Sequence, residues 1–315
     1  MRTGLALAVL IAVAGQRAEG LAWPAGGNGP SARDRLVVMA DESLAAARQL
    51  SGRGARAEAH VLARRALDLY EDALGLGPPD AELHYRAYVA AQLYQTASPS
   101  PEDFHAVIRH VDGLRAADPL DPRLTDMLAA LCHALARLAA VGGPEADALL
   151  ERGIHEYEKM FQLLGLRGPE GAADLAVSYA NVAELLMAVE RLEDALEYYR
   201  LSTTLPTRDL PALRYYGLAV AHDRLGQAEQ ARQAMLRALE LDPELGELHD
   251  ERVYFVPDGD IHYYEALAHE TAGRTSAAIR AYREFLAVAQ TVRPAYRNRA
   301  REHLDAMTGH ATRAR

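Results

Sequence analysis

The sequence predicts an all-α fold made of consecutive helical hairpins. Half of the 315 residues are apolar, and alanine, leucine, arginine and glutamate dominate the composition, which favours helices over strands. Glycines cluster between the apolar runs, as expected of short turns between helices. No segment alternates apolar and polar residues for long enough to predict a strand; the nearest, 252–256, has five residues.

The segment 212–243 shows the hairpin pattern most clearly. Ala219 and Ala231 are small residues at the positions where two antiparallel helices would approach each other closely. Gly226 can adopt the left-handed backbone that ends the first helix, and Pro243 stops the second. The other apolar positions of the pattern are Leu218, Met235 and Ala238.

This unit resembles the tetratricopeptide repeat, a pair of antiparallel helices in about 34 residues. The resemblance implies a solenoid that coils as a right-handed superhelix, in which the first helix of each pair lines a concave groove. Members of this family bind an extended peptide or a partner helix there. The resemblance therefore implies a non-catalytic scaffold, and we expect no catalytic residues and no cofactor.

The same pattern continues on both sides of this unit. Segments 176–206 and 259–289 align with it, and the three clear units together span 171–293. Three more pairs, interrupted by loops rich in glycine and proline, are expected in 32–170. We expect the last helix and the basic tail, 294–315, to cap the exposed end of the stack.

The N-terminal segment predicts export to the bacterial periplasm. Residues 1–22 have one arginine, a short apolar run and then small residues, as in a secretory signal, and 23–31 has the composition of a linker. The run is shorter than the about 20 apolar residues that span a bilayer. Cleavage after Ala14, Ala18 or Ala22 fits this pattern. An uncleaved anchor and a cytoplasmic adaptor with an apolar first helix are the alternatives.

The formal charge of −10 argues against nucleic acid as a partner. Arginines are concentrated after residue 273, and three of them form a basic stripe on the predicted last helix: Arg293, Arg297 and Arg301. The stripe could contact an acidic partner or an anionic membrane surface, although most such stripes simply face solvent. No membrane contact is expected beyond the signal segment.

Residues on the first helix of each pair are the candidates for the partner-binding groove that the resemblance implies. They are Tyr85, Arg86, Val89, Asn181, Glu184, Tyr216, Val220, Asp223, Tyr263, Leu267 and Glu270. Tyrosine suits such a surface because it combines a large apolar area with a polar tip. Packing between neighbouring hairpins is the alternative role of the tyrosines.

An insertion at 244–258 interrupts the rhythm of the repeats. Insertions in repeat arrays form loops on one face, often the binding face. Tyr254 and Phe255 are the large apolar residues of this insertion and could bind a partner. They could instead pack against the stack.

The alternative to a scaffold is a metal-dependent enzyme that uses a group of possible ligands at 249–262. These are His249, Asp250, Glu251, Asp258, Asp260 and His262. Turn chemistry at Pro257, and a helix N-cap at Asp260, explain much of this group without a metal, so no metal site is predicted. His269 begins a zinc-protease motif, but Gly273 replaces the second histidine. Cys132 is the only cysteine and lies in an apolar helical stretch, which predicts a buried, inert thiol.

The sequence thus predicts a protein–protein interaction scaffold rather than an enzyme. The signal-like segment adds the expectation that the scaffold serves the assembly of a bacterial envelope complex.

Overall fold

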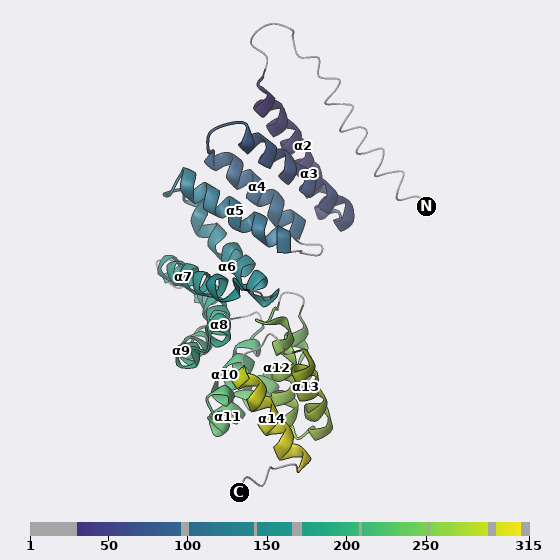
Figure 1. Cartoon of the computed structure of the whole chain (residues 1–315), viewed down its shortest axis with the longest axis vertical. Coiled ribbons are helices and arrows are strands. Elements are labelled where there is room, and N and C mark those ends of the chain that lie inside the picture. The colour runs from purple at the N-terminus through teal and green to yellow at the C-terminus, as the bar shows by residue number, and fades with distance from the viewer. Residues whose placement is uncertain are drawn as a thin grey trace, which may run out of the picture. The chain divides into compact units, whose positions relative to one another are not determined.

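The computed structural model describes residues 30–95, 101–141, 144–165, 172–207, 210–250, 253–288 and 294–309. Helices form nearly all of these residues, and no strand occurs among them (Figure 1). The predicted signal segment, 1–22, and most of the predicted linker lie outside the described residues. No described helix combines the length and the apolar character that crossing a bilayer requires. The all-helical prediction is confirmed.

The chain divides into two compact units, Met1–Met127 and Leu128–Arg315. Unit 1 contains α2 (Ala32–Gly52), α3 (Arg56–Gly75), α4 (Ala81–Gln95), α5 (Pro101–Ala117) and the start of α6 (Arg123–Val141). Helix α2 packs on α3, and α4 packs on both α3 and α5. Ser31 and Asp34 form a reciprocal capping box that starts α2, because each side chain accepts a hydrogen bond from the backbone N–H of the other.

Unit 2 continues with further helical pairs. Its elements are α7 (Ala146–Gly165), α8 (Ala172–Ala188), α9 (Leu192–Thr204), α10 (Leu213–Arg224), α11 (Ala228–Leu241), α12 (Ile261–Thr271), α13 (Thr275–Val288) and α14 (Pro294–Thr308). Two short 3-10 turns, η2 (Gly246–His249) and η3 (Asp258–Asp260), lie between α11 and α12. Cys132 of α6 is buried, as predicted, and its thiol lies 3.9 Å from the Gly153 carbonyl oxygen of α7.

The α10–α11 hairpin shows why the repeat needs small residues. Ala219 and Ala231 are at most 2% exposed. At Gly217 a Cβ atom would lie 2.3 Å from the ring of Tyr199 on α9, so only glycine permits this approach of two pairs. Gly226 has a φ of 72° and ends α10 as predicted. The six helical pairs expected from the sequence are present, from α2–α3 to α12–α13.

Candidate functional site

Most of the residues predicted to line a groove in unit 2 are buried. They are Glu184, Tyr216, Val220, Asp223, Tyr263 and Leu267, each at most 8% exposed. A side chain without solvent access cannot contact a partner unless the unit rearranges. These residues therefore belong to the interior of unit 2, and their expected place on an accessible groove is corrected.

Different parts of the chain enclose these residues. The Tyr216 hydroxyl donates to the Asp242 carbonyl at the end of α11, Glu184 is enclosed by α9, α12 and the insertion, and α14 covers Asp223.

Helix α14, yellow in Figure 1, packs on α13 and forms ion pairs with α10 and α12. The Tyr296 hydroxyl donates to the Met187 carbonyl of α8 at 2.5 Å, and Arg299 donates to Asp223 of α10 at 2.7 Å. Thus α14 contacts the first helices of several pairs as well as α13, which a simple end cap would not do.

A second cluster fixes α14 to α12. His303 Nδ1 lies 2.9 Å from Glu270 Oε2, and its Nε2 lies 3.0 Å from Asp223 Oδ1. Burial lowers the pKa of His303, but its hydrogen bonds to these two carboxylates outweigh burial and raise the pKa to about 9. For the Asp223 carboxyl, burial acts in the opposite direction and raises the pKa. Hydrogen bonds from His303 and Arg299 outweigh burial and hold the pKa of Asp223 far below its usual value. Both groups are therefore charged near neutral pH.

An ion pair inside unit 2 joins α10 to the start of α12. Arg224 donates to both carboxylate oxygens of Asp260 at 2.7 Å, and both side chains are 1% exposed. The guanidinium also lies 3.9 Å from the centre of the Tyr296 ring. Asp260 precedes α12, as predicted, but its side chain makes no capping hydrogen bond and binds Arg224 instead.

The insertion packs against unit 2 rather than forming an exposed edge. Phe255 is buried and meets the Tyr264 ring edge-on at 4.9 Å, while Tyr254 meets His133 at 4.8 Å. Glu184 accepts hydrogen bonds from Tyr264 at 2.5 Å and from the Val256 backbone at 3.4 Å. This packing corrects the expectation that Tyr254 and Phe255 form a binding edge.

The Glu184 carboxyl that holds the insertion has an unusual environment. Burial, together with the nearby Asp260 carboxylate, raises the pKa of Glu184 to about 7. The Tyr199 hydroxyl also donates to it at 3.0 Å. Glu184 is therefore a structural link between α8, α9, α12 and the insertion.

The remaining groove candidates keep some exposure. Tyr85, Arg86 and Val89 on α4 are half-buried, as are Asn181 on α8 and Glu270 on α12. Glu270 is already engaged, because it accepts from the Tyr282 hydroxyl at 2.9 Å in addition to its contact with His303. In the basic stripe, Arg297 is half-buried, Arg301 is exposed, and Arg293 lies outside the described residues.

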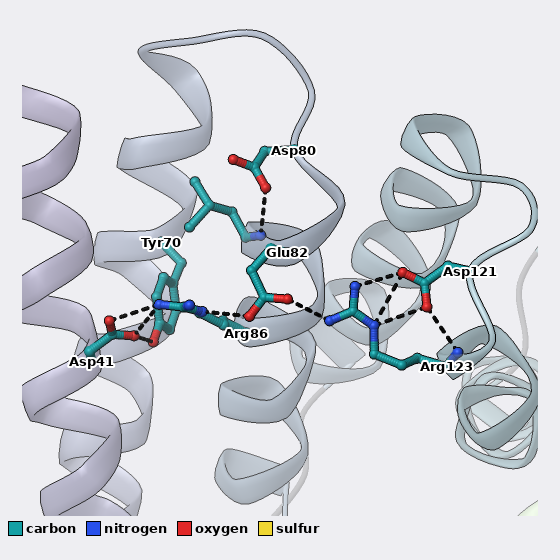
Figure 2. A network of polar contacts seen from close by, with 8 residues as sticks. Asp41, Tyr70, Asp80, Glu82, Arg86, Asp121 and Arg123 are labelled. Carbon is teal, nitrogen blue, oxygen red and sulfur yellow. Dashed lines mark hydrogen bonds and ion pairs between the residues drawn. The ribbon is translucent and has the colours of Figure 1, made fainter.

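In unit 1 an accessible row of alternating charges crosses successive first helices (Figure 2). We call this row the charged ladder; its members are Asp41, Glu82, Arg86, Asp121 and Arg123. Arg86 pairs with Asp41 of α2 and with Glu82 at 2.8 Å each. Arg123 pairs with Glu82 and with Asp121 at 2.6 Å each.

Most side chains of the charged ladder are accessible to solvent, and their positions are fixed by contacts within unit 1. The side chains of Asp41, Glu82, Arg86 and Arg123 are between 31% and 50% exposed. The Tyr70 hydroxyl of α3 donates a hydrogen bond to Asp41 Oδ1 at 2.5 Å and so fixes the carboxylate. The Arg123 guanidinium lies 4.4 Å from the centre of the Tyr85 ring. A partner could therefore meet charges of both signs and an aromatic ring whose positions are already fixed.

The sequence predicts surface roles for Arg86 and Tyr85, whereas the roles of Asp41, Glu82 and Arg123 appear only in the structure. Glu82 and Arg86 are four residues apart on one helix face, and this spacing by itself predicts their ion pair. Asp41 and Arg123 belong to other helices, and only the packing of hairpins brings them to α4.

The possible metal ligands at 249–262 separate into two groups. Asp260 is committed to Arg224, and Glu251 and the side chain of Asp258 lie outside what the structure describes. His249 and His262 both approach Glu265, at 3.1 and 3.0 Å. Sequence reasoning did not include Glu265 in this group.

Comparisons with known proteins agree with the helical pairs. A family model described as Tetratricopeptide repeat matches residues 212–245, which contain the α10–α11 hairpin. No curated protein sequence matches the chain.

Three solved structures show distant likeness. An assembly chaperone of RpL4 (Acl4) aligns over 87% of this chain and 99% of its own, at 17% identity and a TM-score of 0.49. A crystal structure of MamA aligns over 59% of this chain and 88% of its own, at 18% identity and a TM-score of 0.38. YrrB, described as a TPR protein with an unusual peptide-binding site, aligns over 71% of this chain and 99% of its own, at 17% identity and a TM-score of 0.42. At such low identities these likenesses carry no further argument, and the match to the tetratricopeptide repeat covers residues 212–245.

Proposed function

We propose that this chain, whose residues 212–245 match the tetratricopeptide repeat, is a non-catalytic scaffold that binds a segment of another protein through unit 1. The binding surface is the charged ladder together with Tyr85 and Val89. Its partner is a peptide or helix that carries charges of both signs, since the ladder alternates in sign from Asp41 to Asp121.

The observation that supports this choice is the difference between the two units. In unit 2, α14 contacts the first helices α8, α10 and α12 through Tyr296, Arg299 and His303. Within the described residues of unit 1, no helix crosses α2 and α4 in this way. The contacts of α14 also illustrate what such a face accepts: a helix that offers an aromatic ring and hydrogen-bonding cations.

The test reverses the charge of two ladder residues in the full chain, Arg86→Glu and Arg123→Glu. The control reverses two arginines of comparable exposed pairs on α11, Arg232→Glu and Arg237→Glu. Exposed ion pairs contribute about 1 kcal/mol or less to stability, so the α11 variant and the Arg86 substitution should leave the fold intact. Arg123 also pairs with Asp121, whose side chain is only 6% exposed, so circular dichroism and urea denaturation of the ladder variant must show a wild-type fold before its binding is compared.

Capture from an extract of the native host identifies the partner, and titration with the purified partner measures its affinity. We expect the ladder variant to bind at least about tenfold more weakly than wild type, and the α11 variant to bind normally. Equal binding by all three proteins would exclude the charged ladder as the binding surface.

We further propose that the scaffold works in the envelope, as part of an assembled complex. The composition of residues 1–22 supports export. N-terminal sequencing of the protein from fractionated host cells tests this proposal. A mature N-terminus in the periplasmic fraction would support it, and an intact Met1 in the cytosolic fraction would overturn it.

A further inference from the structure

Unit 2 contains a cluster of histidine and glutamate side chains that the scaffold function does not use. His262 and Glu265 lie on the first turns of α12, Glu284 lies on α13, and His249 lies on η2 within the insertion. Three separate elements therefore contribute to it. Imidazole and carboxylate together are ligands for transition-metal ions such as Zn²⁺.

The distances fit one ion. One ligand atom each from His262, Glu265 and Glu284 lie within 4.8 Å of one another. His262 Nδ1 is 3.0 Å from Glu265 Oε2 and 3.9 Å from Glu284 Oε2. Ligand atoms around a tetrahedral zinc, at bonds of about 2.0–2.2 Å, lie about 3.3–3.6 Å apart. The half-exposed Glu284 side chain therefore needs only a small rotation to complete a three-ligand site.

A fourth ligand is available from the insertion. His249 Nε2 lies 3.1 Å from Glu265 Oε1, so the two oxygens of Glu265 face two different imidazoles. The His249 side chain is 57% exposed, and its imidazole has to move toward His262 and Glu284 to complete the coordination.

The charge of the cluster also favours a cation. In the described part of the chain, neither arginine nor lysine forms an ion pair with Glu265 or Glu284; both carboxylates contact histidine. Elsewhere in the same unit, carboxylates such as Asp223 and Asp260 are paired with arginine. Two carboxylates that converge on one histidine without an arginine create a negative potential that attracts a cation.

We propose that His262, Glu265 and Glu284 bind one divalent transition-metal ion of the zinc class, with His249 as the fourth ligand. Because His249 belongs to the insertion, the ion fixes η2 to the α12–α13 hairpin. The site has a structural role and lies in unit 2, so it is independent of the charged ladder.

Calorimetric titration of the metal-free full chain with Zn²⁺ tests this site. We expect wild type to bind one ion per chain, and Glu265→Gln and His262→Gln each to weaken binding at least about tenfold. The matched control is His155→Gln, because His155 and Glu158 form a similar pair on α7, three residues apart at 3.7 Å. This pair has no third ligand in the described residues, so the control should bind as wild type does.

A second measurement separates this site from other histidine clusters. Bound Zn²⁺ should slow amide hydrogen exchange at 246–249 in wild type but not in Glu265→Gln. His84 and His110, whose Nδ1 atoms lie 3.3 Å apart in unit 1, form the main competing site. The proposal is overturned if wild type binds no stoichiometric ion, if Glu265→Gln binds as tightly as wild type, or if His110→Gln removes the bound ion instead.

Discussion

At the scale of single residues, burial of charge decides where unit 2 is most sensitive. Arg224 and Asp260 hold each other at 2.7 Å with almost no exposure to solvent. A buried charge that loses its partner cannot be solvated, whereas replacing both charges by apolar residues removes the problem. An ion pair of the same geometry on the surface would contribute little to the free energy of unfolding.

We therefore expect Arg224→Met to lower the free energy of unfolding by about 3–5 kcal/mol, because Asp260 is left buried without its partner. Urea denaturation measures this change. The double variant Arg224→Met, Asp260→Leu should recover most of the loss. Arg232→Met, which breaks an exposed pair on α11, should change stability by less than about 1 kcal/mol. A loss in Arg224→Met no larger than in Arg232→Met would contradict this account.

His303 should make stability depend on pH. Its pKa is raised from 6.5 to about 9 in the folded protein, so folding favours the protonated imidazole. The stabilisation is fully present below about pH 6.5 and is lost as the pH rises through about 9; it amounts to about 3 kcal/mol. The groups that face His303 are Asp223 of α10, Glu270 of α12 and the stacked Tyr282 ring of α13.

The measurement compares wild type with His303→Gln in urea at pH 6 and at pH 10. Wild type should be the more stable at pH 6, and the difference should shrink by about 3 kcal/mol at pH 10. Glu184 also titrates, but it does so in both proteins and cancels in the comparison. A difference that stays constant with pH would refute the raised pKa.

At the scale of secondary-structure elements, the close approach of α9 and α10 depends on one glycine. Gly217 lies against the Tyr199 ring, and Tyr199 is itself held by Glu184. The Tyr199 ring is also buried, so moving it aside would disturb its packing and its hydrogen bond. Overpacking at such a position forces the helices apart.

Gly217→Ala should therefore lower the free energy of unfolding by about 1–3 kcal/mol, although alanine favours helices more than glycine does. The control is Gly75→Ala at the end of α3, where an added Cβ would meet nothing within 4 Å. This control should be neutral or stabilise by up to about 1 kcal/mol. Thermal unfolding of the two variants checks the prediction, which fails if both behave alike.

At the scale of the whole molecule, contacts are made mainly between successive elements. Helix α10 touches α8, α9, α11 and α12, and stability in such arrays is approximately a sum of repeat and neighbour terms. Damage in one unit should therefore remain local.

Hydrogen exchange measured by mass spectrometry can show this locality. In Arg224→Met we expect faster exchange in α10, α12 and α14, which share the buried pair and its Tyr296 contact. Exchange in α3 of unit 1 should be unchanged. An equal increase in α3 would mean that the two units unfold as a single cooperative body.

Much of the architecture could be predicted from local patterns. The six helical pairs, the turn at Gly226 and the buried thiol of Cys132 follow from residues close in sequence, because helix periodicity and turn conformation are local properties. The candidate site was predicted less well, since Tyr85 and Arg86 remain accessible whereas Tyr216 and Tyr263 do not.

By itself, the sequence determined that the chain consists of helical hairpins and where each hairpin turns. Only the tertiary structure decided which faces stay open. Tyr296 meets Met187 across 109 residues, Arg299 meets Asp223 across 76, and Arg123 meets Glu82 across 41. Such pairs depend on how the hairpins stack and how α14 folds back on unit 2, which no periodicity within a single helix encodes.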